Sequence, residues 1–527
     1  MIRPFQLLVL LVLFVSCSAD PTVDRVSVNI NPNRPISAAI RPNFVGFSIE
    51  TFTALNWFGS NPKRVKDSFV VLMKQLMMTS GQRGPEFRIG GNSADVAAFS
   101  YDNELLPNTS FIITPNELIM INEAMKSINS AAVHDLYFRL DSNYTYGVNH
   151  VQAINDIIGW DNVLALEIGN ECDLYGGNGY RDPKTWSFDT YVGEWRNYVN
   201  TIRAALPSLR PNLFQGATFL TSNWLKDLAG FTQTQQKDLL TVSIHAYPST
   251  HCGHNVTIDQ LLSDDEAESE ANLIIANHLV SGNSNLTVPL QIGESNDVSC
   301  HGQPDVSDTF ASALWLIDYL FNLARVNVRG ISIHERNETN SYSVILWRGI
   351  NSQIPFVQPK YYGVSLFNYA TRDHCQIVAT QKLMSSVPYV KVWSCFNDHR
   401  LTITIIHKNY TTESLAHVAL NITLPQQFHS NNQLIPNATS YHLNATNIKT
   451  NRDIEWSGLT WRDTKDGRPR GVRRGFPVQP FHRGNNSWAI YEIFIRPASA
   501  MVVEINWRRP TETSDDLNEI PPIVSSF

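Results

Sequence analysis

Between residues 44 and 335 the chain alternates eight short apolar runs with segments of helical periodicity. The runs cover residues 44–50, 87–92, 136–141, 163–169, 213–219, 242–247, 288–293 and 329–334. The clearest helical segment, residues 307–325, places Phe310, Leu314 and Ile317 on one stripe. Eight strand–helix units over roughly 300 residues predict an α/β fold, a (β/α)₈ TIM barrel. A doubly wound sheet is the alternative, but no glycine-rich phosphate loop follows the first run.

The pattern changes after about residue 370, where helical stripes cease and short strands separated by turns take over. This change predicts a C-terminal β-sandwich domain. A strand-like run at residues 26–30 precedes the barrel and is expected to join the sandwich. We therefore expect a signal peptide at 1–19, an N-terminal strand at 20–40, the catalytic barrel at 41–370, the β-sandwich at 371–507 and a flexible tail at 508–527.

The N-terminus has the features of a secretory signal. Arg3 precedes an unbroken apolar run of nine residues, 7–15, and small residues follow up to Ala19. The run is too short to span a bilayer, which disfavours the alternative of a membrane anchor. Asn-x-Ser/Thr sequons, for example at Asn108 and Asn255, agree with export. We expect a secreted or lysosomal-lumen glycoprotein with no membrane partner.

Charge gives a weaker constraint on partners. The net charge is −7, which argues against a nucleic-acid partner because such proteins usually carry a basic footprint. One segment is basic, since residues 461–474 hold five Arg and one Lys with two Asp. Two interpretations stay open: a solvated loop between strands, or a contact for an acidic glycan through Arg470, Arg473 and Arg474.

The ends of the predicted barrel strands are polar. Active sites of such barrels lie at the C-terminal strand ends, which here carry Glu50, Arg88, Asn92, Asp141, Asn170, Glu171, His245, Tyr247, Glu294, Asn296, His334 and Glu335. The sequences IGNE and IGE end the fourth and seventh runs, on facing sides of the barrel. A lone Glu at a strand end is more often a structural residue, but two carboxyl groups about 5 Å apart are what retaining glycoside hydrolysis needs. The matched pair, Glu171 and Glu294, therefore favours catalysis.

The same residues carry a resemblance to known proteins. Asn170-Glu171 and Glu294 resemble the acid/base and nucleophile motifs of the large clan of retaining glycosidases with (β/α)₈ barrels. The stretches EIGNECDLYGG (167–177), IGESNDVSCHGQPDVSDTFASALWLIDYLF (292–321) and FRIGGNSAD (87–95) are similar to glycoside hydrolase family 79. That family contains β-glucuronidases and heparanase. The similarity extends from about residue 25 to 506 and is nearest to the microbial exo-acting β-glucuronidases.

The resemblance implies individual roles. Glu171 would be the acid/base, Glu294 the nucleophile, Asn170 a ligand of the sugar 2-hydroxyl and Tyr247 a neighbour of the nucleophile. No cofactor and no metal are implied. Cys172 stands where relatives usually carry proline, which is expected to loosen the loop without removing activity.

Contacts to the substrate are expected from further residues. Tyr342 is the candidate for the glucuronate carboxylate, Glu50 for sugar hydroxyls, and His245 for a further substrate contact. The loop HERNETNSYS (334–343) departs from the His-x-Gly pattern of the family. Arg88 is expected to be structural and to hold the strand-end carboxylates near the site.

Five cysteines follow the predicted signal peptide: Cys172, Cys252, Cys300, Cys375 and Cys395. Histidines at 251, 254 and 301 raise the alternative of a zinc cluster, but their spacing matches no common zinc pattern. An oxidising compartment favours a Cys252–Cys300 disulfide, with Cys375–Cys395 as a second bridge and Cys172 free.

The predicted function is a retaining hydrolase that removes terminal β-linked glucuronic acid, with or without a 4-O-methyl group, from a carbohydrate substrate. One alternative is an endo-acting, heparanase-like enzyme for glucuronate-containing polysaccharide. A second alternative, from another class, is a glycan-binding protein without catalysis. The presence of both Glu171 and Glu294 argues against that last alternative.

Overall fold

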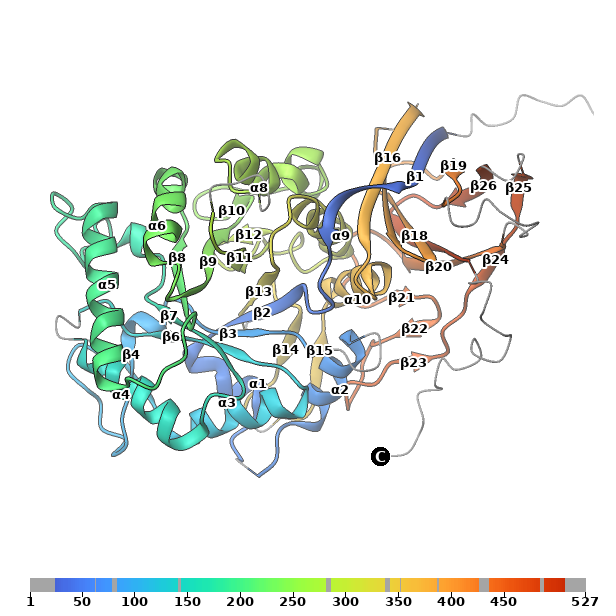
Figure 1. Cartoon of the computed structure of the whole chain (residues 1–527). Coiled ribbons are helices and arrows are strands. Elements are labelled where there is room, and N and C mark those ends of the chain that lie inside the picture. The colour runs from blue at the N-terminus through green and yellow to red at the C-terminus, as the bar shows by residue number, and fades with distance from the viewer. Residues whose placement is uncertain are drawn as a thin grey trace, which may run out of the picture.

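The computed structural model of the chain contains a barrel and a β-sandwich that lie side by side (Figure 1). It describes residues 24–507 except 62, 78–82, 141–143, 281–285, 337–341, 351, 386–387, 426–435 and 484–487. The predicted signal peptide and the predicted tail therefore lie outside the described residues. In the part of the chain that the structure describes, we find no helix with the length and apolarity needed to cross a membrane.

Eight parallel strands close into the predicted barrel. They are β2 (Val45–Glu50), β3 (Phe87–Gly90), β6 (Ala132–Leu136), β7 (Val163–Ile168), β8 (Phe214–Phe219), β9 (Leu239–Ala246), β11 (Leu290–Ser295) and β13 (Ile331–Glu335). Their order around the barrel follows the sequence, and β13 closes it by pairing with both β11 and β2. The strands are almost wholly buried, because helices cover the outside and side chains fill the inside.

The third strand corrects the sequence prediction. We expected a strand at residues 136–141, but β6 spans Ala132–Leu136 and shares only its last residue with that run. His134 and Asp135 interrupt the apolar pattern of β6, and both are buried. Asp135 is paired with Arg88 from the neighbouring strand (3.4 Å), a partner that the local sequence does not reveal.

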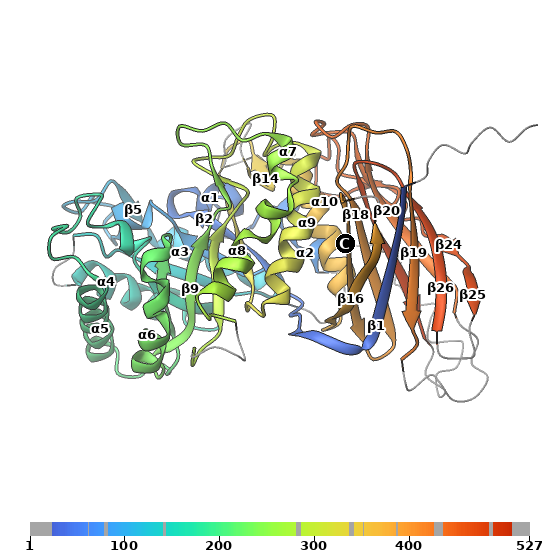
Figure 2. The same cartoon turned by 90° about the horizontal axis from the view of Figure 1, so that it is seen from above.

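Helices and short strands occupy the connections of the barrel. The helices are α1 (Ala54–Phe58), α2 (Asp67–Leu76), α3 (Pro115–Ser127), α4 (Thr145–Ala153), α5 (Phe188–Ala205), α6 (Leu228–Gln235), α7 (Ile258–Leu261), α8 (Asp264–Ala276), α9 (Phe310–Arg325) and α10 (Pro359–Thr371). The short strands are β4 (Ala97–Phe99), β5 (Phe111–Ile113), β10 (Ser249–Thr250), β12 (Val298–Ser299), β14 (Ile345–Trp347) and β15 (Pro355–Val357). The elements α1, β5, α7 and β14 follow C-terminal strand ends and lie along the upper edge of Figure 2.

The remaining strands form the C-terminal domain. They are β1 (Asp24–Ala39), β16 (Gln376–Ser385), β17 (Val390–Asn397), β18 (Arg400–His407), β19 (Ala416–Thr423), β20 (Ala438–Ala445), β21 (Ile454–Trp456), β22 (Leu459–Thr460), β23 (Arg470–Gly471), β24 (Phe476–Val478), β25 (Pro480–Arg483), β26 (Trp488–Ile495) and β27 (Ser499–Asn506). The hydrogen-bonded order runs from β23 through β20, β27 and β18 to β1, β19 and β26. Alternate residues of β18 and β19, such as Ile405 and Leu420, share one buried core, which is the packing of the predicted sandwich.

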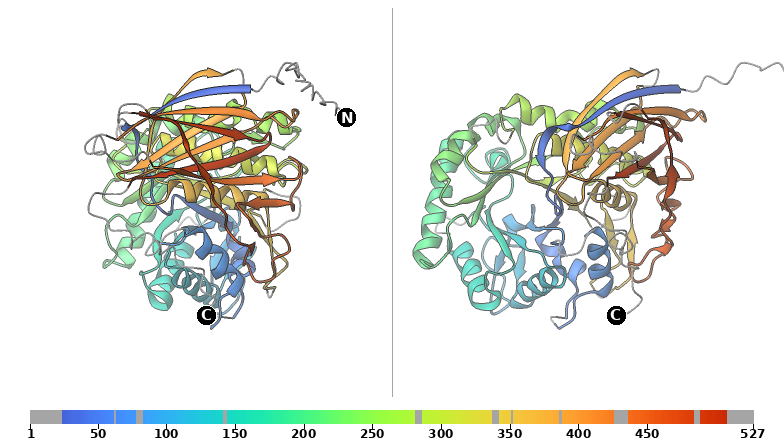
Figure 3. Two further views of the ribbon diagram at one scale, coloured as in Figure 1. Left: turned by 90° about the vertical axis from the view of Figure 1, so that its right-hand side faces the viewer. Right: turned by 45° about the vertical axis from the view of Figure 1, so that its right-hand side comes forward.

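The N-terminal strand β1 is an internal strand of this domain. It pairs antiparallel with β16 and parallel with β19, and Figure 3 shows it in blue along the orange β16. Val26, Val28 and Ile30 on β1 point into the sandwich core.

Two buried helices, α9 and α10, join the barrel to the sandwich. All residues of α9 except the last are buried, because the barrel covers one side and β17 covers the other. Across this junction the rings of Phe321 and Trp393 stack with centroids 5.5 Å apart, and the Trp393 indole N–H donates to Asp318 (2.7 Å). Lys408 forms an ion pair with the same carboxylate (2.5 Å). Satisfied polar contacts of this kind fix the geometry of an interface.

The structure forms both expected disulfides. Cys252 is bonded to Cys300 and Cys375 to Cys395, while Cys172 is free and buried. The first disulfide joins the segments that follow β9 and β11, where β10 pairs in parallel with β12.

Candidate active site

Arg88 on β3 is the centre of a buried polar cluster at the C-terminal end of the barrel. Its side chain is 1% exposed. It donates hydrogen bonds to the carboxylates of Glu167 (2.8 Å), Glu294 (2.6 Å) and Asp135 (3.4 Å), the hydroxyl of Ser48 (3.3 Å) and the amide oxygen of Asn170 (2.8 Å). Burial lowers the pKa of Arg88, but the surrounding carboxylates outweigh it and raise the pKa. The guanidinium therefore stays charged and draws the ends of four strands together.

Glu294 at the end of β11 is an ionised carboxylate. Its Oε2 accepts from Arg88, its Oε1 accepts from the Tyr247 hydroxyl (2.7 Å), and the His334 Nδ1 lies 3.4 Å from Oε2. Burial raises the pKa of Glu294, but the charges of His334, His245 and Arg88 and the Tyr247 hydrogen bond lower it to about 2. At neutral pH the group is thus a desolvated anion held by directed donors, which is the state required of a nucleophile.

Glu171 faces Glu294 from the end of β7. One carboxylate oxygen of each, together with a ring nitrogen of His245, lie within 4.8 Å of one another. Glu171 adopts a left-handed backbone conformation with φ 48° and ψ 50°, which is uncommon for a non-glycine residue and frequent at functional sites. The following loop is anchored by Asp173, whose carboxylate accepts from the backbone N–H groups of Leu220 (3.2 Å) and Thr221 (2.7 Å).

His245 lies beside both carboxylates and contacts Glu171. Its Nδ1 lies 2.9 Å from Glu171 Oε1. Burial lowers the pKa of His245, but the charge of Glu294 and the hydrogen bond to Glu171 outweigh it and raise the pKa. Within the described residues, Glu171, His245 and Glu294 are also the group with donor atoms close enough to hold a metal ion. The Arg88 guanidinium 2.6 Å from Glu294 opposes a second cation there, so the donors fit proton exchange better than metal binding.

The substrate-binding candidates lie around Glu171 and Glu294, and they differ in how many contacts they already make within the protein. Asn170 is 3% exposed, and its amide is engaged on both sides, by Arg88 and by the Asn92 oxygen (3.0 Å). Glu50 accepts from the Ser93 backbone N–H (2.9 Å). Tyr342 is buried with its ring 6.3 Å from that of Tyr247. Asn170 and Glu50 therefore brace the site in the structure, and any sugar contact that they make requires their remaining lone pairs or protons.

Glycine at two positions of the FRIGGNSAD stretch has a steric reason. A Cβ on Gly91, whose φ is +78°, would lie 2.7 Å from the Glu50 carboxylate. A Cβ on Gly90 would lie 2.8 Å from the Asp135 side chain. Only glycine lets the backbone pass this close to both acids.

Two supporting pairs were not among the predicted site residues. Behind Glu171, the buried Tyr175 hydroxyl donates to Asp95. Behind Glu294, the buried Lys360 forms an ion pair with Asp297 (2.9 Å) and donates to the Tyr342 carbonyl (3.0 Å). Asp95 and Asp297 lie within the quoted family stretches, which is a signal that the sequence offered. Lys360 lies in a helix with no local sign of this role.

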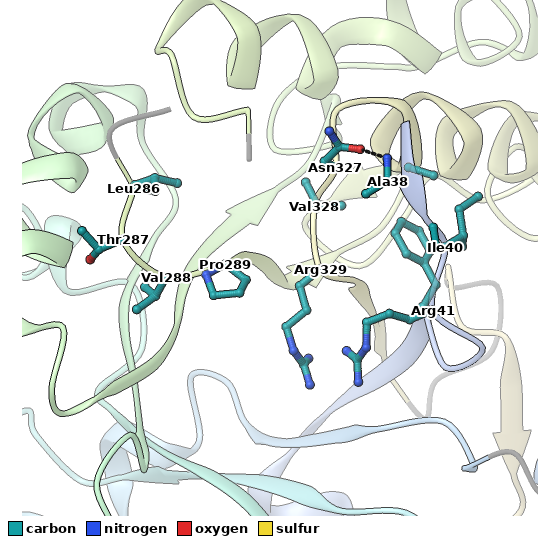
Figure 4. A pocket seen from close by; sticks show the side chains of 13 residues that line it. Ala38, Ile40, Arg41, Leu286, Thr287, Val288, Pro289, Asn327, Val328 and Arg329 are labelled. Carbon is teal, nitrogen blue, oxygen red and sulfur yellow. Dashed lines mark hydrogen bonds between the residues drawn. The ribbon is translucent and has the colours of Figure 1, made fainter. Parts of the chain in front are cut away.

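Some expected contributors cannot be placed. Asp141 and residues 337–341 of the loop after β13 lie outside the described residues. A pocket of about 520 Å³ lies at the opposite, N-terminal end of the barrel (Figure 4). Its arginines, Arg41 and Arg329, extend side by side and both contact Glu86, at 3.0 and 2.6 Å. That end of such barrels serves stability rather than catalysis.

A parallel (β/α)₈ barrel with two carboxylates facing each other across its mouth defines the class of protein: the chain is a glycoside hydrolase. More particularly, residues 137–321 match the sequence model of the glycosyl hydrolase family 79 N-terminal domain. This match confirms the resemblance to family 79 that the strand-end motifs predicted.

Comparisons with two curated proteins over longer parts of the chain agree with that family. A protein named β-glucuronidase from Neurospora crassa is 24% identical over 85% of this chain and 89% of its own length. One of the same name from Aspergillus niger is 26% identical over 66% of this chain and 69% of its own length.

Among solved structures, a 4-O-α-L-rhamnosyl-β-D-glucuronidase from Fusarium oxysporum superposes with a TM-score of 0.68 at 16% identity, covering 90% of this chain and 99% of that chain. A family 51 arabinofuranosidase from Xanthomonas axonopodis gives a TM-score of 0.64 at 12% identity, covering 92% of this chain and 100% of that chain. These likenesses show the barrel-plus-sandwich fold.

Proposed function

We propose that the enzyme removes terminal β-linked glucuronic acid by retaining double displacement. The observation that carries the proposal is the pair Glu171 and Glu294, whose oxygens lie within 4.8 Å in unequal surroundings. Retaining enzymes hold their carboxyl groups about 5–5.5 Å apart, whereas inverting enzymes leave roughly 6.5–9.5 Å for a water molecule. The relatives named β-glucuronidase support the choice of sugar.

In the first step the ionised Glu294 attacks the anomeric carbon of the glucuronide. The bond from that carbon to the leaving oxygen breaks, and Glu171 gives its proton to this oxygen. In the second step Glu171 takes a proton from water, whose oxygen attacks the anomeric carbon and releases Glu294 as a carboxylate. The Arg88 and Tyr247 donors, at 2.6 and 2.7 Å, orient the nucleophile, and His245 holds Glu171 toward the bond that breaks.

We propose exo rather than endo action. The exits of β9 and β11 are held together by the β10–β12 ladder and by the Cys252–Cys300 disulfide. This braced segment begins two residues after Tyr247 and four after Glu294, so it forms a wall beside the nucleophile. A wall on that side suits a pocket for a chain end better than an open cleft. Export of the enzyme is part of the proposal and is supported by the two disulfides.

The test is a panel of aryl β-glycosides: glucuronide, 4-O-methylglucuronide, glucoside, galactoside and xyloside. We expect the glucuronides to exceed every neutral sugar in kcat/KM by at least about 100-fold, because a site built for a charged group discriminates strongly against its absence. Proton NMR of the first product should show the β-anomer. A neutral sugar as best substrate would refute the uronate assignment, and an α-anomer as first product would refute the retaining mechanism.

A further inference from the structure

A second pocket lies at the junction of the barrel and the sandwich. It has a volume of about 200 Å³ and is formed between the β14–β15 hairpin and the sandwich segment 451–465. The charged residues that line it are mainly basic: Arg348, Arg452, Arg462 and Lys465. The protein as a whole carries a net charge of −7, so this pocket is a positive region on an acidic molecule.

Acidic neighbours neutralise only part of this charge. Arg452 is paired with Asp463, and Arg462 is paired with Asp453 and, at 3.5 Å, with Asp463. Arg348 and Lys465 are exposed, and neither has an ion-pair partner among the residues that the structure describes. Four cations therefore meet two carboxylates, and two positive charges remain available to a ligand.

The floor of the pocket is rigid. Trp461 is 4% exposed and packs edge-on against Tyr361 and Tyr362 of α10, with ring centroids 5.0 and 5.2 Å apart. Its backbone N–H donates to the Tyr362 hydroxyl (2.8 Å). The packed Trp461 fixes the backbone from which the neighbouring Arg462 extends, which reduces the ordering cost of binding.

The β14–β15 hairpin connects the pocket to the candidate active site along the chain. Val344 and Ile345 donate their backbone N–H groups to the carboxylate of Glu335, the last residue of β13, at 2.9 and 3.3 Å. The β14 strand begins at Ile345 and turns into the β15 strand, whose residues line the pocket. The hairpin thus leads from the mouth of the barrel toward the sandwich, and Figure 2 shows β14 on the edge that carries the mouth.

We infer that this pocket binds an anionic group, carboxylate or sulfate, of an acidic glycan whose terminal sugar occupies the active site. Guanidinium groups suit both anions because their N–H donors match the geometry of two oxygens. The hairpin that connects the barrel mouth to the pocket favours a glycan over other polyanions. The choice of ligand rests on the proposed function, whereas the prediction of anion binding at this pocket does not.

The experiment measures binding by calorimetry on the catalytically blocked Glu294→Gln protein, so that no turnover interferes. The probes are an octasaccharide of alternating glucuronate and N-acetylglucosamine, a sulfated heparan-type octasaccharide, and a neutral xylo-oligosaccharide of the same length. The test variant adds Arg348→Ala and Lys465→Ala. The matched control adds Arg34→Ala and Lys237→Ala, which removes the same charge from exposed positions outside the pocket.

We expect the test variant to bind at least one acidic probe about 10-fold more weakly at 50 mM salt, and the difference to shrink at 500 mM salt as charges are screened. The control should stay within twofold, and the probe that loses affinity identifies carboxylate or sulfate. No loss, an equal loss in the control, or an equal loss for the neutral probe would overturn the inference.

A parallel assay separates this inference from the proposed function. With Glu294 intact, Arg348→Ala/Lys465→Ala should hydrolyse an aryl glucuronide within twofold of the unmodified enzyme and keep its melting temperature. A fall in aryl glucuronide turnover would contradict a site outside the catalytic pocket. Absence of glucuronide hydrolysis in the unmodified enzyme would refute the proposed function, and the binding result would still decide the inference.

Discussion

The two ends of the barrel each bury an arginine–carboxylate network, and the networks differ in their charge balance. At the N-terminal end, Glu86 accepts from Arg41, Arg329 and Asn43, so donors outnumber acids. At the C-terminal end, Arg88 faces the carboxylates of Glu167, Glu294 and Asp135, so acids outnumber arginines. The Glu86 network has two arginines for one carboxylate, whereas the Arg88 network has one arginine for three carboxylates.

The C-terminal end also contains carboxyl groups whose pKa values are shifted in opposite directions. Burial and the charge of Glu167 raise the pKa of Asp135 well above its usual value, and burial raises the pKa of Asp95 to about 7. The pKa of Glu294, which lies beside Arg88 and accepts from Tyr247, is shifted in the opposite direction, to about 2. Titratable groups whose environments push their pKa values apart are the mark of an acid–base site. The Glu86 network, in contrast, lowers the pKa of Glu86 and leaves no group to exchange protons.

The largest expected difference between the two ends is in turnover. Glu294→Gln should lower kcat for an aryl glucuronide by at least about 10⁴-fold, because the neutral amide cannot attack the anomeric carbon. Glu86→Gln should keep kcat within twofold and should destabilise the fold by about 1–3 kcal/mol, because it leaves the largely buried Arg329 without its carboxylate partner. Steady-state kinetics and urea unfolding measure the two effects. Comparable loss of turnover in both variants would show that the ends are not functionally distinct.

A smaller effect is expected at Tyr247, whose hydroxyl lies 2.7 Å from Glu294. Tyr247→Phe should lower kcat/KM by about 100-fold, in the range of lost electrostatic support to a reacting group. Since this hydrogen bond lowers the pKa of Glu294, its loss should raise that pKa and move the acid limb of the kcat/KM profile to higher pH. An acid limb that stays in place while activity falls would assign Tyr247 to substrate binding instead.

The smallest effect concerns stability as a function of pH. Asp95 has a folded-state pKa of about 7 against 3.8 for the unfolded chain, so its contribution to stability is complete below pH 3.8 and is lost as pH rises through 7. Asp95→Asn should therefore abolish a decline of about 2 kcal/mol between pH 5 and 7. Urea unfolding of both proteins across this range measures it. Identical pH dependence in the two proteins would mean that Asp95 is ionised in the fold.

The sequence predicted those parts of the molecule whose signals are local. Periodicity identified the barrel, and the strand ends supplied Glu171, Glu294, Tyr247 and His245 at the mouth. The predicted position of β6 in the sequence was wrong because His134 and Asp135 break its apolar pattern. The sequence predicted a structural role for Arg88. It could not predict all of the groups that Arg88 contacts, because its five acceptors come from residues spread between positions 48 and 294 and no local pattern encodes that geometry.

The place of β1 in the sandwich has a consequence for synthesis of the chain. Asp24 pairs with Ala416 and Val26 with Ser385, so β1 can pair only after β16 and β19 have been synthesised. Domains usually fold as units during synthesis, yet here all eight barrel strands lie between β1 and its neighbours in the chain. Its apolar residues lack their partners until then, which gives a chaperone a defined segment to protect.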